Sequence, residues 1–267
     1  MRQTLLSRWP LAQCPDPAEA MRSVNALMAP ASVRGIEALS SEPGYFRLNG
    51  FADQDFAVGF ISTDLGLKAN VSAERDPSYF LAFGVFGEMP LEVGKRQLSS
   101  TRSVAAVVNP DERLLVLPER QPTGSLAIRL GRRFVDRELT ALAGKDPGSD
   151  VRFDPVLDLS RPGPSAVREL LGGMLTQFDS EHEVLTRPAM RRAEMRLIVT
   201  SLLLRPSKPG PLGWARTPSG LASVVSGYDS ADPIPAVGGI RLAFGGGAGG
   251  DFARIASVKV LDATTLA

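Results

Sequence analysis

The chain has 267 residues, of which 43% are hydrophobic and 22% are charged, so it is long enough to bury the core of one large domain or two modest ones. Its formal net charge of +1 provides no overall field that would attract nucleic acid or an anionic membrane. The single cysteine, Cys14, excludes an intramolecular disulfide and a cysteine-based zinc site. No signal peptide and no run long enough to span a bilayer is present, so we expect a cytoplasmic protein without membrane contact.

Residues 1–44 alternate short apolar runs with prolines, and they predict an irregular N-terminal arm with one short helix near Pro17–Met28. From Tyr45 onward the sequence is typical of an antiparallel sheet. Short runs rich in β-branched and aromatic residues are separated by turn residues, which favours a barrel or sandwich. The predicted strands are Tyr45–Leu48, Phe56–Ile61, Leu67–Val71, Ser78–Val85, Leu91–Gln97, Val104–Val108, Arg113–Leu117 and Ser125–Leu130.

At Gly131 the apolar period changes from two to about 3.6, which predicts a helix that ends before Gly144. The most regular amphipathic helix follows Pro164, although Gly172 and Gly173 weaken its middle. A further helix is predicted over Pro188–Leu204, with Met190, Ala193, Leu197, Ser201 and Leu204 on one side. Strands followed by helices indicate an α+β domain over residues 45–205.

The apolar stripes of the two long helices exceed what one face of a barrel needs to cover. Because soluble monomers avoid exposed apolar patches, the excess predicts a homodimer formed through these helices. The side chains predicted to form the dimer contact are Val167, Leu170, Leu171, Met174, Leu175, Phe178, Met190, Leu197 and Leu204.

Residues 206–267 are rich in glycine and proline and carry no helical period, so they predict a tail unlike the rest of the chain. Gly245–Gly250 matches the spacing G-x-G-x-x-G of dinucleotide-binding loops. The helix, strand and acidic residue that such a fold needs next do not follow, so we reject a nucleotide site there.

The chain offers little catalytic chemistry. Its single histidine, His182, lies between acidic residues in the linker that joins the two long helices, where a solvated loop is expected. A cupin-type metal site needs two or three histidines, and catalytic triads need a base beside a nucleophile. The sequence therefore predicts no catalytic residue, no cofactor and no metal, and a protein that is not an enzyme.

The remaining charged pairs and clusters have simple structural interpretations. Carboxylate pairs next to turns are expected for turn chemistry, and they are Asp53 with Asp55 and Asp111 with Glu112. Four arginines near the start of the last helix spread around it, which is typical of a solvated face. They are Arg187, Arg191, Arg192 and Arg196.

The order of the parts resembles the N-terminal regulatory domain of AraC-type transcription regulators, of the AraC-binding-like class. The resemblance rests on Ser103–Pro110, on Leu126–Leu139, where a strand passes directly into a helix, on Val151–Leu159, and on the helix pair. It covers about Tyr45 to Leu204. It implies a cupin-like barrel without metal chemistry, two helices used for dimerisation, and a role in sensing or assembly, in which a small-molecule effector is a possible partner.

In that family two helix-turn-helix units follow and bind promoter DNA, whereas residues 206–267 predict neither amphipathic nor basic recognition helices. We therefore expect the regulatory part of a regulator without its DNA-binding domain, or a gene read out of frame after about Pro206, and no sequence-specific DNA binding. The alternative is a stand-alone module that binds a small molecule or dimerises. The single histidine disfavours a third option, a cupin enzyme.

Overall fold

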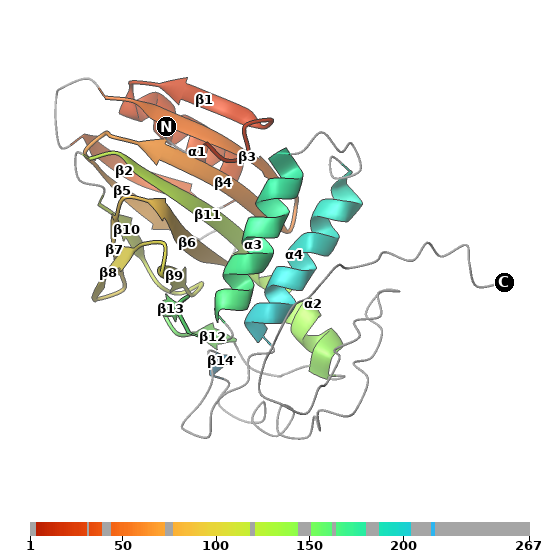
Figure 1. Ribbon diagram of the computed structural model, residues 1–267. Helices are drawn as coiled ribbons and strands as arrows, with labels where there is room; N and C mark the ends of the chain where they lie inside the picture. The colour runs from red at the N-terminus through yellow and green to blue at the C-terminus, as the bar shows by residue number, and fades with distance from the viewer. Residues whose placement is uncertain are drawn as a thin grey trace.

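The computed structural model describes residues 4–30, 32–38, 44–72, 77–117, 121–143, 151–161, 164–179, 187–203 and 215–216. Two antiparallel sheets face each other, and three helices cover the outer face of the larger one (Figure 1). The α+β class is confirmed. The larger sheet contains β1 (Pro10–Cys14), β3 (Phe46–Ala52), β4 (Phe56–Thr63), β11 (Thr123–Gly131), β6 (Ser78–Phe86), β9 (Val104–Val108) and β13 (Val156–Asp158), in that spatial order.

The smaller sheet contains β2 (Ser32–Ala38), β5 (Leu67–Ser72), β10 (Leu114–Val116), β7 (Met89–Val93) and β8 (Arg96–Ser100), again in spatial order. A short pair joins β12 (Arg152–Phe153) to β14 (Ala215–Arg216). The helices are α1 (Pro17–Met28), α2 (Arg132–Ala143), α3 (Pro164–Asp179) and α4 (Pro188–Leu203).

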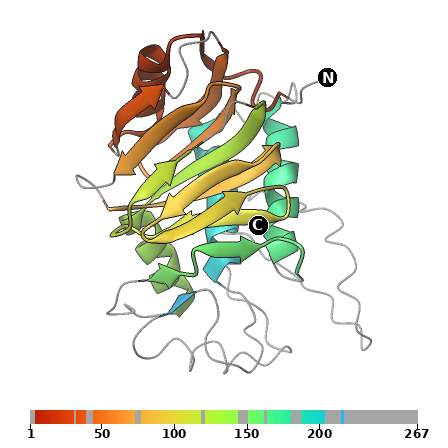
Figure 2. The ribbon, with the colours of Figure 1, turned by 90° about the vertical axis from the view of Figure 1, so that its left-hand side faces the viewer.

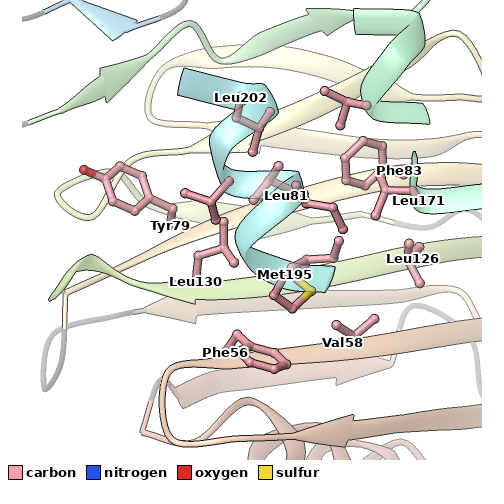
Figure 3. Close-up of a cluster of buried hydrophobic side chains, with 14 of the residues drawn as sticks. Phe56, Val58, Tyr79, Leu81, Phe83, Leu126, Leu130, Leu171, Met195 and Leu202 are labelled. Atoms are coloured by element: carbon pink, nitrogen blue, oxygen red, sulfur yellow. The ribbon is translucent and has the colours of Figure 1, made fainter. Parts of the chain in front are cut away.

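The two faces of the larger sheet carry different side chains because successive residues of a strand point to opposite sides. On β11, Leu126, Ile128 and Leu130 belong to the core on the helix side, whereas Ala127 packs on the side of α1 and β5. Figure 3 shows Leu171 of α3 and Met195 and Leu202 of α4 gathered over strand residues such as Val58 and Leu126. The helix layer therefore shares one apolar core with the sheet.

Helix α1 lies against the other face of the larger sheet, beside β3 and β4. It begins where Asp16 accepts a hydrogen bond from the Ala18 amide (2.9 Å) and proline occupies the first turn. Gly59 makes its close approach feasible, since a Cβ there would lie 2.6 Å from the Leu27 side chain. The helix predicted near Pro17–Met28 is confirmed with those bounds.

The structure differs from the sequence prediction in three places. The N-terminal arm predicted over residues 1–44 is not irregular outside its helix. Strand β1 is an edge strand of the larger sheet, and β2 is an edge strand of the smaller one. The single strand predicted over Leu91–Gln97 is a hairpin of β7 and β8, which turns at Gly94 with a φ of 62°. Helix α4 buries a different side from the one predicted, namely Met195, Ile198, Val199, Leu202 and Leu203.

Candidate functional site

Ion pairs connect the helix layer, which consists of α2, α3 and α4, to the larger sheet. The turn between β3 and β4 presents Asp53 and Asp55 to the helix layer. Arg192 of α4 lies 2.9 Å from Asp53 and 3.8 Å from Asp55, and Arg137 of α2 lies 2.9 Å from Asp55. The turn carboxylates thus hold two helices at one end of the sheet.

A second ion pair joins two helices directly. Arg196 Nε of α4 lies 2.9 Å from Glu138 Oε1 of α2, and the Glu138 side chain is only 8% exposed. An arginine this close offsets part of the cost of removing such a carboxylate from water. The pair fixes the positions of α2 and α4 relative to each other.

The arginine cluster at the start of α4 is used within the chain rather than left as a basic surface. Arg192 and Arg196 form the ion pairs described above, and the Arg191 guanidinium lies 5.2 Å from the ring centres of both Trp9 and Phe51. Such cation–π contacts are typical of partly desolvated arginines. Arg187 is exposed, and its side chain makes no hydrogen bond, ion pair or ring contact with another side chain in the part of the chain that the structure describes.

The side chains predicted to form a dimer contact fall into two groups. Five of them are buried in the core that α3 shares with the sheet of the same chain: Val167, Leu171, Met174, Leu175 and Phe178. Leu170, Met190 and Leu197 are half-buried, and Leu204 lies outside the described residues. The predicted stripe on α3 therefore covers the sheet of its own chain.

Sequence reasoning missed the apolar side of α4 because this helix is apolar on several sides near its end. Leu197, Ile198, Val199, Leu202 and Leu203 supply apolar residues in more than one direction, so the spacing does not identify the buried one. Asp53 and Asp55 were predicted as turn residues, but not as the partners of arginines on the helices. Their partners on α2 and α4 had no signal in the sequence.

Gly172 and Gly173 lie on the outer side of α3, exposed to solvent. A Cβ built at either glycine would meet no heavy atom within 4 Å. The packing of this chain therefore does not require glycine at either position.

The described residues offer no cluster of three or more histidine, cysteine, aspartate or glutamate side chains that could hold a metal ion. His182 lies outside those residues. Burial raises the pKa of the Cys14 thiol, which makes the reactive thiolate scarcer at neutral pH. None of the helices in the described ranges is long and apolar enough to cross a membrane.

A family model described as the AraC-binding-like domain matches residues 48–204. Among solved structures, the AraC-like transcriptional activator CuxR is 13% identical with a TM-score of 0.44, over 76% of this chain and 73% of that one. A cupin 2 conserved barrel domain protein from Salinispora arenicola is 15% identical with a TM-score of 0.29, over 36% of this chain and 84% of that one. A predicted oxalate decarboxylase from Thermotoga maritima is 8% identical with a TM-score of 0.29, over 36% and 91%. A search of curated proteins finds no significant match.

Proposed function

The chain belongs to the AraC-binding-like domain family, and from this premise we propose that it is the regulatory part of an AraC-type transcription regulator, which senses an effector and dimerises. The observation that carries the proposal is the extent of the family match. It runs from β3 to the end of α4, and it includes every strand of the two sheets except β1 and β2 as well as the three helices of the helix layer. The match therefore includes strands of the two facing sheets, to which we assign sensing, and helices α3 and α4, to which we assign dimerisation.

The two facing sheets support the sensing role. Ligand sites commonly lie within or at the mouth of β-barrels, where apolar walls carry a few polar groups. A thermal-shift screen of small metabolites on the full chain tests this role. We expect one compound to raise the melting temperature with a saturable dose dependence, because a ligand that binds only the folded state stabilises it. A screen in which every compound fails would count against an effector.

The proposed dimer would use the outer side of the helix pair, since the inner side is already packed. Leu170 and Leu197 are half-buried, and the outer side of α3 also carries the two exposed glycines. Helices that present small residues can approach each other closely. A second copy packed on this side would cover the apolar surface that these leucines still expose.

Sedimentation equilibrium on the wild type and two variants tests the dimer. We expect the wild type to be dimeric at tens of micromolar and Leu197→Glu to be a folded monomer by circular dichroism. Met195→Glu is the matched control, because Met195 is on the same helix and fully buried in the chain's own core, so its variant should unfold. A monomeric wild type, or a Leu197→Glu variant that remains a dimer, would refute this contact.

A further inference from the structure

The segment that precedes β1, residues 4–9, contacts the last residue of α3, more than 170 positions away in the sequence. The backbone amides of Leu6 and Ser7 both donate hydrogen bonds to the Asp179 carboxylate, at 2.9 and 2.6 Å, and the Ser7 hydroxyl adds a third at 3.1 Å. Hydrogen bonds to a carboxylate are stronger than those between neutral groups. One side chain thus fixes two consecutive peptide units.

The backbone of this segment is held in an uncommon conformation. Leu6 has a φ of 53°, in the left-handed region that residues with a Cβ rarely occupy. Its side chain is nevertheless 0% exposed and belongs to the core on the helix side of the sheet. Such strain persists only where surrounding contacts over-determine the conformation, and here the Asp179 bonds and the buried leucine do so.

The same segment also contacts α4. Trp9 lies 5.2 Å from the Arg191 guanidinium and 5.2 Å from the Phe51 ring, and Phe51 lies 4.8 Å from Phe178 of α3. Arg191 is in the first turn of α4, and Asp179 ends α3. Residues 4–9 therefore contact both helices at neighbouring ends.

On its other side the segment is attached to the sheet. The Gly50 amide donates to the Trp9 carbonyl (2.8 Å), and the Asn49 side-chain amide donates to the Leu5 carbonyl (2.9 Å). Both acceptors are backbone oxygens of the segment, and both donors are on β3. The segment thus bridges β3 and the ends of α3 and α4.

Asp179 occupies an unfavourable place for a carboxylate. The last turn of a helix carries partial negative charge, and α3 has no basic residue in that turn to offset it. The two amides and one hydroxyl of residues 4–9 supply the compensating donors. Release of the segment would remove these three donors from a carboxylate at a helix end that has no basic residue in its last turn, so the end of α3 depends on the segment.

We propose that residues 4–9 are a strap that locks the adjoining ends of α3 and α4 onto β3, and that the strap and these helix ends release together while the sheet stays intact. The strap controls how stably the ends of α3 and α4 pack against the larger sheet. This inference goes beyond the proposed function and requires neither an effector nor DNA.

Hydrogen exchange measured by mass spectrometry on the full chain tests the strap, with Asp179→Ala as the main variant and Asp179→Asn as the milder one. We expect exchange to rise at least tenfold in peptides from residues 4–9, from the last turn of α3 and from the first two turns of α4, with β4 and β11 unchanged. Glu169→Ala is the matched control, because Glu169 is an exposed carboxylate on the same helix, and it should change nothing.

A second measurement covers the case in which Asp179→Ala folds poorly. In a Trp214→Phe background Trp9 is the remaining tryptophan. Asp179→Asn should expose the Trp9 indole ring and so increase the quenching of its fluorescence by acrylamide. Exchange that rises in residues 4–9 alone, that rises equally in β4 and β11, or that does not rise would overturn the proposal. Trp9 quenching unchanged by Asp179→Asn would overturn it as well.

Discussion

Arg192 on α4 and Asp53 in the β3–β4 turn, 139 residues apart, lie 2.9 Å from each other. The arginine side chain is 47% exposed and the aspartate side chain 12% exposed, so the contact lies at the edge of the helix layer. Asp53 also accepts, through its backbone carbonyl, a 3.4 Å hydrogen bond from Arg129 Nη2 of β11. Arg129 is on the opposite face of the sheet from Ile128 and Leu130, which face the helices. The turn therefore contacts arginines on both sides of the sheet.

Removal of either partner of this pair should destabilise the chain modestly, because a half-exposed ion pair is screened by water. We expect Arg192→Ala and Asp53→Ala each to lower the free energy of unfolding by about 1 kcal/mol. A double-mutant cycle from urea denaturation should give a coupling of about 0.5 kcal/mol that shrinks at high salt. Arg187→Ala, the exposed neighbour, should be neutral, and a coupling of zero would show that the pair contributes nothing.

The sequence predicted the five central strands of the larger sheet, β3, β4, β11, β6 and β9, and the extents of the helices, because their periods are strong and their ends carry turn or capping residues. Val104–Val108 was predicted with its observed bounds, and Pro164 marks the start of α3. The element that each apolar helix face packs against was not predictable. The stripe from Val167 to Phe178 has the same spacing whether it covers a sheet or a second helix, so the period alone left its partner open.

The tie between residues 4–9 and Asp179 was equally invisible in the sequence. Leu6 and Ser7 contribute backbone amides, which every residue except proline possesses. A left-handed φ at a leucine also runs against its intrinsic preference. Such contacts are made by the tertiary structure and leave no local signal.

Leu171 is 3% exposed in the core between α3 and the sheet. We therefore expect Leu171→Ala to lower the free energy of unfolding by about 2–5 kcal/mol, from lost apolar burial and the cavity left behind. Leu170→Ala is the control on the same helix. Because Leu170 is only half-buried, its truncation should cost clearly less in chemical denaturation followed by circular dichroism. Equal costs would mean that the outer side is as tightly packed as the inner side.

Burial raises the pKa of Glu194 on α4 above its ordinary value. The folded chain then holds the proton of this carboxyl at pH values where the unfolded chain has released it. This contribution to stability is present below the unfolded pKa and is lost as the pH rises through the folded pKa. Glu194→Gln should flatten the decline of stability with pH over that window and leave the variant more stable than the wild type at neutral pH.

Denaturation midpoints measured from mildly acidic to neutral pH would check the Glu194 prediction. Glu169→Gln on α3 is the control, since Glu169 is exposed and should leave the profile unchanged. If Glu194→Gln follows the wild-type profile throughout, then desolvation of this carboxyl does not affect stability.

Gly172 and Gly173 provide a test that separates the stability of one chain from its association. Within one chain a Cβ at either position meets open space, and glycine in a helix interior is less favourable than alanine by about 1 kcal/mol. Gly172→Ala and Gly173→Ala should therefore each stabilise α3 and raise the melting temperature of the monomer.

If a second chain packs closely on this side, the added methyl groups should weaken the dimer instead. We expect the double variant to show both effects, a higher melting temperature at low concentration and a larger dissociation constant by sedimentation equilibrium. A dissociation constant that stays unchanged would place the dimer contact elsewhere, and a lower melting temperature would contradict the open space seen around both glycines.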